Sequence, residues 1–315
     1  MRIIFLGTGD IGVPSLESLI DAGHEIPAVV TQPDKPAGRK LELRPSAIKT
    51  VALARGIQVL QPGKIREPAA IAQLRAFAPE VLVVMAYGQI LPRAVLDIPT
   101  VACLNLHASL LPRHRGAAPI QAAIESGDQE SGITVMYMAE GLDTGDILLK
   151  APLPIGPQET GGSLHDRLAH VAPKALAEAL DLLAAGNAPR IPQNDSLATY
   201  AAKLTREHGE IRWNASAREI DLKIRAMNPW PSAHTWIASS EGLRKLKVFA
   251  CEKEEAASGS PGSVLRADRQ GILVATGQGG ILLHEVQLEG KRRMSAHEFL
   301  LGHPLAPGTI LGEVA

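Results

Sequence analysis

The first half of the chain alternates short apolar runs with stretches of helical spacing, and this alternation restricts the folds that it can adopt. The apolar runs are Ile3–Leu6, Ala28–Thr31, Val81–Ala86 and Ala102–Leu106. The stretches of helical spacing are Pro14–Ala22, Ser46–Arg55 and Pro68–Ala76. Strands that alternate with helices build βαβ units, whose strands lie parallel in one sheet. The pattern therefore predicts an α/β first domain with a Rossmann-like parallel sheet.

The second half of the chain carries a different pattern. An alanine-rich amphipathic stretch, Leu164–Ala185, is expected to be the last helix of the first domain, and the proline-containing residues after it indicate a linker. Apolar runs separated by glycines then predict strands at Leu246–Cys251, Gly262–Ala267, Gly271–Thr276 and Gly280–Gln287. Short strands with glycine turns are typical of a small β-barrel. We expect residues 1–188 to form the first domain, 189–207 the linker and 208–315 the second domain.

The charge balance and the cysteine content exclude some classes of protein. With 32 basic and 33 acidic residues the net charge is −1, so a nucleic-acid partner would have to be bound by local basic patches. Cys103 and Cys251 do not make a disulfide scaffold and suit a reducing compartment. Because no apolar run is long enough for a membrane span or a signal peptide, we expect a cytoplasmic monomer with no membrane partner.

Two polar side chains stand at the end of the fourth apolar run. Asn105 and His107 are two residues apart, and in a strand such residues project from the same face. Ligands of open α/β sheets bind at the carboxyl ends of the strands. Further along, expected strands at Ile133–Met138 and Ile147–Pro152 enclose a glycine-flanked loop that carries Asp143. An amide for an oxyanion, an imidazole for proton transfer and a carboxylate to orient the imidazole suit acyl transfer.

Longer motifs accompany these three residues. Ser109-Leu110-Leu111-Pro112-Arg113-His114-Arg115-Gly116 follows His107, and Glu140-Gly141-Leu142-Asp143-Thr144-Gly145 surrounds the carboxylate. With the Asn-x-His pattern, these segments resemble those of the formyltetrahydrofolate-dependent transferases. The resemblance continues through Gln32–Arg39, Ala198–Lys203, Asn228-Pro229-Trp230-Pro231 and Gln287–Ala296, and so covers nearly the whole chain.

The resemblance implies a reaction and its ligands. The formyl group of the co-substrate 10-formyltetrahydrofolate would move to the α-amino group of the methionine carried by initiator tRNA, for translation initiation. Asn105, His107 and Asp143 would be the catalytic residues, in a Rossmann-like formyltransferase domain. The second domain would be a tRNA-binding β-barrel that is similar to an oligonucleotide-binding fold. The residues that would line the folate site are Ser109, Leu110, Leu111 and Pro112.

A basic loop from Asp34 to Arg44 leaves the same edge of the expected sheet as this site. Pro36 and Gly38 are expected to break any regular element there. A charged run of this kind is either solvated surface or a flexible loop that holds phosphates beside the reacting group. The resemblance favours the second alternative and implies tRNA contacts by Lys35, Arg39 and Lys40.

Gly7-Thr8-Gly9-Asp10-Ile11-Gly12 has the spacing of a dinucleotide-binding loop. An NAD site would also need an acidic residue at the end of the second strand, where the chain has Val30-Thr31-Gln32-Pro33. We therefore interpret the glycines as allowing a tight turn and expect no NAD. We also expect no metal, because the His, Cys, Asp and Glu residues lack the spacing of metal ligands.

Three alternatives stay open at this point. A formyltetrahydrofolate hydrolase would share the three catalytic residues and use water in place of the amine. An NAD-binding oxidoreductase would need the acidic residue that the second strand lacks. A pure RNA-binding module would have no use for Asn105, His107 and Asp143 together.

Overall fold

The computed structural model describes residues 1–37, 42–239 and 242–312, and the chain divides into two units. The first unit takes Met1–Pro119, Glu130–Pro154 and His165–Ala201. The second unit takes Ile120–Gln129, Ile155–Leu164 and Ala202–Ala315. Two short segments that interrupt the first unit along the chain thus belong to the second unit.

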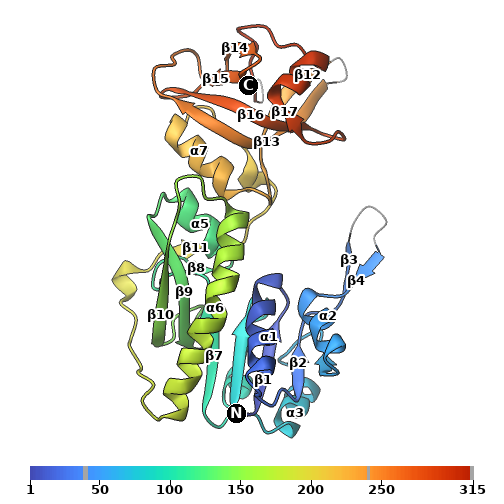
Figure 1. The fold of residues 1–315 in the computed structure, drawn as a ribbon, viewed down its shortest axis with the longest axis vertical. Coiled ribbons are helices and arrows are strands. Elements are labelled where there is room, and N and C mark those ends of the chain that lie inside the picture. The colour runs from blue at the N-terminus through green and yellow to red at the C-terminus, as the bar shows by residue number, and fades with distance from the viewer. Residues whose placement is uncertain (38–41, 240–241, 313–315) are drawn as a thin grey trace. The chain divides into compact units, whose positions relative to one another are not determined.

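A mixed sheet forms the centre of the first unit (Figure 1). Its strands follow the order β10 (Ile147–Pro154), β9 (Glu130–Tyr137), β7 (Ala102–His107), β6 (Val81–Met85), β1 (Ile3–Gly7), β2 (Ala28–Val30) and β5 (Gln58–Leu60). The strands from β7 to β5 are parallel, and β9 and β10 extend the sheet as antiparallel strands. Every residue of β1 and β6 is buried, which is why these strands are continuous apolar runs. The expected parallel sheet is confirmed.

The helices α1 (Val13–Asp21), α2 (Ala47–Ala54), α3 (Pro68–Ala76) and α4 (Arg93–Leu96) lie between the parallel strands along the chain. The long helix α6 (Gly161–Ala184) follows β10, the last strand of the sheet. In Figure 1, α1 and α6 lie in front of the strands. Along α6, Leu168, Ala172, Leu176 and Leu180 recur at every fourth position and are all buried, so one face of the helix packs. Within the described ranges, no helix is both long and apolar enough to cross a membrane.

The basic loop after β2 contains a β-hairpin. Strand β3 (Lys35–Ala37) pairs antiparallel with β4 (Glu42–Arg44), and Pro36 lies opposite Leu43. The expectation that Pro36 and Gly38 would break any regular element was therefore wrong for Pro36; Gly38 lies outside the described residues. Proline is tolerated because both strands of an isolated hairpin are edge strands, where a missing N–H donor leaves no ladder incomplete.

The second unit is an antiparallel sheet with short helices. The pairing path runs β12 (Ala233–Ser239), β13 (Gly242–Glu254), β16 (Gly280–Leu288), β15 (Gly271–Ala275) and β14 (Val264–Asp268), and β17 (Met294–Ser295) pairs with β16. The helices are α5 (Pro119–Glu125), η3 (Glu207–Gly209), α7 (Ala217–Ala226) and α8 (Ala296–Gly302). Ser216 and Glu219 form a capping box that begins α7. The expected β-rich second domain is confirmed.

Candidate active site

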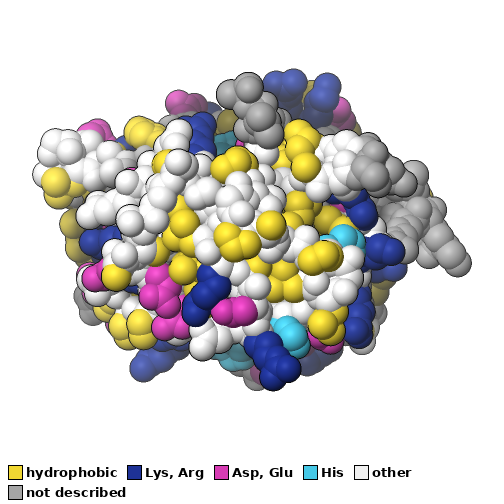
Figure 2. Space-filling view, turned by 90° about the horizontal axis from the view of Figure 1, so that it is seen from above, with side chains coloured by type: hydrophobic (Ala, Val, Ile, Leu, Met, Phe, Trp, Pro, Cys, Tyr) yellow, Lys and Arg dark blue, Asp and Glu magenta, His cyan; other side chains and the backbone are white. Residues whose placement is uncertain are grey.

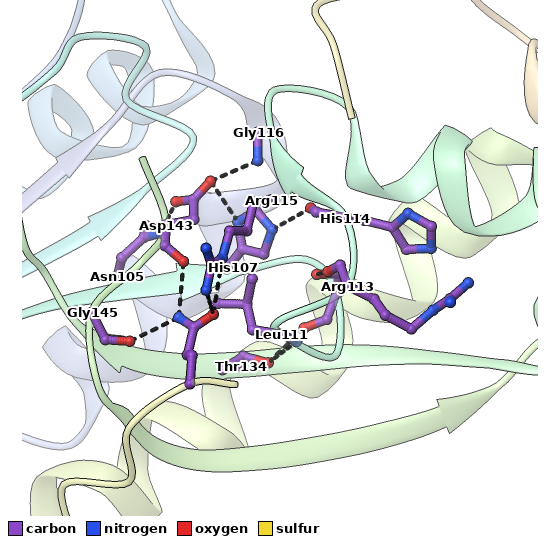
Figure 3. Close-up of polar contacts among 12 residues, drawn as sticks. Asn105, His107, Leu111, Arg113, His114, Arg115, Gly116, Thr134, Asp143 and Gly145 are labelled. Atoms are coloured by element: carbon purple, nitrogen blue, oxygen red, sulfur yellow. Dashed lines mark hydrogen bonds and ion pairs between the residues drawn. The ribbon is translucent and has the colours of Figure 1, made fainter. Parts of the chain in front are cut away.

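The structure brings the three predicted side chains together in the first unit (Figure 3). Asn105 and His107 lie on one face at the end of β7, and Asp143 lies in the loop between β9 and β10. The Asn105 Nδ2 atom is 3.5 Å from Asp143 Oδ1, and the His107 Nδ1 atom is 3.7 Å from Asp143 Oδ2. One carboxylate thus faces both the amide and the imidazole. Their catalytic roles are treated below as part of the proposal.

A backbone carbonyl fixes the ring of His107. The His107 Nε2 atom lies 2.9 Å from the carbonyl oxygen of His114. Because a carbonyl oxygen only accepts hydrogen bonds, Nε2 carries the hydrogen and Nδ1 is left facing Asp143. His114 has a φ of +57°, which is uncommon for a residue with a side chain. The ring of the buried His107 is therefore held by one backbone hydrogen bond, with Nδ1 directed at the carboxylate.

A backbone amide orients the carboxylate of Asp143. Gly116, in the short strand β8 (Arg115–Gly116), donates its N–H to Asp143 Oδ2 at 2.8 Å. Asp143 itself has a φ of +53°, so its loop holds a left-handed conformation at the residue that points into the site.

The segment that was predicted to line a folate site is a hydrogen-bonded turn. The Ser109 hydroxyl donates to the Arg113 carbonyl at 2.7 Å, and Thr134 Oγ1 accepts from the Leu111 amide at 3.1 Å. Leu111 is fully buried against Met136 and Ile147. The side chains of Leu110 and Pro112 are partly exposed. Among the four predicted residues, these two have apolar surface to offer a ligand.

The glycine-rich loop after β1 is closed by the chain itself. The amides of Thr8 and Gly9 both donate to the Ala86 carbonyl, at 3.1 and 3.3 Å. A Cβ on Gly7 would lie 2.7 Å from the Phe5 ring and 3.0 Å from the Met85 carbonyl. These glycines therefore allow close packing between β1 and β6, whereas a dinucleotide site needs amides that point at a pyrophosphate.

The base of the β3–β4 hairpin is anchored to α2 and β5. Lys49 donates to Asp34 Oδ2 at 2.7 Å, and the Gln61 amide donates to Asp34 Oδ1 at 2.7 Å. The hydrogen bond from Lys49, followed by that from Gln61, holds the pKa of Asp34 below its usual range. Lys35 is exposed on β3, and Arg39 and Lys40 lie outside the described residues. Asp34 is thus a structural anchor and not a carboxylate open to a ribose.

Several basic side chains of the second half face acidic partners. The ion pairs are Lys223–Glu125, Arg225–Asp221, Arg292–Glu298 and Arg293–Glu285. Figure 2 shows Lys and Arg side chains in small groups, several with Asp or Glu beside them, around apolar side chains. In the residues described, no group of three His, Cys, Asp or Glu side chains could hold a metal ion.

Sequence reasoning missed two side chains behind the site, Arg115 and Gln193. The Arg115 guanidinium, 2 % exposed, donates to Gln193 Oε1 from Nε at 3.0 Å and from Nη2 at 2.7 Å. The Gln193 amide nitrogen then donates to the carbonyls of Asp143 and Gly145, each at 2.8 Å. Carbonyl contacts of this kind leave no residue-type pattern, so only the placement of Arg115 within a family motif gave a signal.

Both halves of the chain are similar to known protein families. The formyl transferase family matches residues 1–180, and the C-terminal domain of formyl transferases matches residues 203–304. The methionyl-tRNA formyltransferase of Methylacidiphilum infernorum is 51% identical over 317 residues, which covers 99% of this chain and 98% of that protein. The methionyl-tRNA formyltransferase of Geotalea uraniireducens is 47% identical over 313 residues, with coverages of 99% and 98%.

A solved structure shares the fold at lower identity. HypX from Aquifex aeolicus, in complex with tetrahydrofolic acid, superposes with a TM-score of 0.65 and 17% sequence identity. The match covers 100% of this chain and 51% of that one, so the chain spans about half the length of HypX.

Proposed function

The chain belongs to the formyl transferase family, and from this membership and the geometry of its site we propose that it formylates methionyl-tRNA. The formyl group of 10-formyltetrahydrofolate moves to the α-amino group of the methionine on initiator tRNA. The observation that carries the proposal is the convergence of Asn105 and His107 on the carboxylate of Asp143. The methionyl-tRNA formyltransferases that match do so over nearly their whole length.

The chemistry follows from the positions of the polar atoms. The amine attacks the formyl carbon, and the carbonyl oxygen becomes an oxyanion in the tetrahedral intermediate. The Asn105 amide has two N–H donors and makes only a long 3.5 Å contact to Asp143, so it can donate to that oxyanion. The amine proton leaves, N10 of the folate takes a proton as the C–N bond breaks, and tetrahydrofolate is released.

We assign the proton transfer between these groups to His107, through its Nδ1 atom. Its Nε2 is committed to the His114 carbonyl, and its Nδ1 is 3.7 Å from Asp143 Oδ2, too far for a full hydrogen bond. The negative charge of Asp143 lies beside the imidazole that would accept the amine proton.

We assign the two substrates to different parts of the first unit. The partly exposed side chains of Leu110 and Pro112 offer apolar walls to the folate. The hairpin that follows Asp34, with Lys35, Arg39 and Lys40, offers positive charge to tRNA phosphates. Lys223 and Arg293 of the second half are each paired with a glutamate, whereas Lys35 of the hairpin is exposed.

The test is a formylation assay with purified protein, 10-formyltetrahydrofolate and methionyl-initiator tRNA. We expect formylmethionyl-tRNA to form and Asn105→Ala to lower kcat by about 100–1,000-fold while the fold is kept. Formate release at the same rate without tRNA would instead identify a hydrolase. An Asn105→Ala variant with more than about a tenth of wild-type activity would remove the oxyanion role.

A further inference from the structure

We propose that Gln193, with Arg115 behind it, is a positioning residue that holds the loop of Asp143 in its active conformation. This inference rests on the proposed function of the same site. Neither residue touches Asn105 or His107 in any contact that the structure shows. Their effect on the reaction would pass through the backbone of the loop that carries Asp143.

The contacts of Gln193 give its amide one orientation. Its oxygen accepts two hydrogen bonds from Arg115, so its nitrogen must face the other way, toward the carbonyls of Asp143 and Gly145. Both N–H groups of one amide are thus used on two carbonyls that flank the turn. Rotation of the Gln193 amide would leave buried N–H donors of Arg115 without an acceptor, which is unfavourable. The guanidinium therefore holds the amide in this orientation.

The loop needs such a support because its own conformation is unfavourable. Asp143 lies at a φ of +53°, a left-handed conformation that a residue with a side chain keeps only where its surroundings enforce it. The backbone of Gly145 packs directly against β9, since a Cβ at Gly145 would lie 1.8 Å from the Tyr137 carbonyl oxygen. Hydrogen bonds at both carbonyls resist the relaxation of Asp143 toward an ordinary conformation.

The segment from Ile191 to Ala201, here called the 191–201 segment, brings Gln193 to this position. Ile191 and Ile147 exchange backbone hydrogen bonds at 2.8 and 3.0 Å, which fixes the segment beside the start of β10. The segment ends in β11 (Tyr200–Ala201), which pairs in parallel with β8. Between them, η2 (Asp195–Leu197) presents Asp195 to the Arg115 guanidinium at 2.7 Å.

The same segment also supports His107. Thr199 Oγ1 accepts from the His114 amide at 2.8 Å, and the Thr199 carbonyl accepts from the Arg115 amide at 2.8 Å. His114 is the residue whose carbonyl orients the His107 ring. One segment therefore fixes Asp143 through Gln193 and His107 through Thr199, and sets the separation of the two catalytic side chains.

Gln193→Glu separates positioning from packing. A glutamate keeps the oxygen acceptor and gives Arg115 an ion pair, so the burial of the guanidinium stays satisfied. It removes the two N–H donors and sets carboxylate oxygen against two carbonyl oxygens. The variant should fold, and kcat for formylation should fall about 10- to 100-fold, because displacement of a catalytic group by about 1 Å costs up to that factor. KM for each substrate should change less than about threefold.

The matched control is Gln158→Glu, the same change at an exposed glutamine, which should keep wild-type kinetics. A second readout is independent of activity: hydrogen exchange of the amides from 140 to 146 should become faster in Gln193→Glu and not in the control. A role confined to satisfying Arg115 predicts wild-type kcat and unchanged exchange in Gln193→Glu, and this result would overturn the proposal.

Arg115→Lys is a second variant that tests the proposal if Gln193→Glu does not fold. Lysine retains the charge but lacks the fork that holds the Gln193 oxygen twice, so kcat should fall with KM nearly unchanged. In the double variant the two losses should not add, since both act through one chain of contacts. Wild-type kcat in Arg115→Lys would refute the positioning role. Absence of formylation by the wild-type protein would count against the proposed function instead.

Discussion

Replacing Gly116 by alanine should disable the site through its backbone. Gly116 has a φ of +116°, and a Cβ there would lie 2.4 Å from the Ala201 carbonyl oxygen. Carbon and carbonyl oxygen tolerate about 3.3 Å, so β8 and β11 must separate by roughly 0.9 Å. A shift of that size away from Asp143 would lengthen the bond from the Gly116 amide to Oδ2, now 2.8 Å, beyond hydrogen-bond range.

The expected magnitudes follow from this displacement. The conformational cost at a positive φ is roughly 1–3 kcal/mol, and the contact with Ala201 adds to it, so the free energy of unfolding should fall by about 2–4 kcal/mol. Because Asp143 loses its backbone donor, kcat should fall about 100-fold in a chain that is still folded. Urea denaturation and steady-state formylation kinetics, both at a temperature well below the melting midpoint, measure the two effects separately.

Gly186→Ala is the matched control for this variant. Gly186 also has a positive φ, +68°, but no atom lies within 4 Å of the position that a Cβ would take there. It should therefore lose about 1–2 kcal/mol of stability and keep its activity. If Gly116→Ala keeps kcat within about threefold of the wild type, the link from β8 to the Asp143 carboxylate is not needed for catalysis.

Three further predictions concern the carboxylate, the hairpin and a thiol. Asp143→Asn should lower kcat by at least about 100-fold without unfolding, because the amide offers His107 no negative charge; kinetics with more than a tenth of wild-type kcat would contradict this. Lys49→Met should release Asp34 and raise KM for methionyl-tRNA by up to about fivefold, with KM for 10-formyltetrahydrofolate unchanged; an equal rise in both would show that the anchor shapes the catalytic pocket. Burial raises the pKa of Cys103 to about 12 from an ordinary value of 9.0. The thiol therefore contributes stability that is complete below pH 9 and is lost as the pH rises toward 12, by up to about 1.4 kcal/mol per unit, and urea unfolding of Cys103→Ser should show a shallower pH slope.

The sequence predicted the parallel strands because burial on both faces leaves a continuous apolar run. It did not predict β5, which is short and only partly buried, or β12, whose buried residues include the polar His234 and Thr235, so that neither strand shows a clear period. The sequence did not predict the β3–β4 hairpin, because a proline usually interrupts a strand. Pro36 is compatible with β3 because β3 is an edge strand.

Some residues of the candidate site could also be predicted from the sequence, and others could not. Asn105 and His107 could be paired from sequence because the period of a strand fixes their common face. Gln193 and Thr199 could not, since their partners lie 50 and 85 positions away along the chain. Gln193 binds main-chain carbonyls and Thr199 a main-chain amide, and such contacts impose no complementary residue type on the other side.

The 191–201 segment also determines where the gene could be cut to make a shorter enzyme. A fragment that stopped before Ile191 would keep the sheet and the three side chains of the candidate site, yet it would lack the partners of Arg115, His114 and Ile147. Its buried guanidinium would lose its acceptors, and the edge of β8 would lose its paired strand. Recombination with a foreign second unit should therefore keep this chain through Ala201, which also retains residues 120–129 and 155–164 of its own second unit.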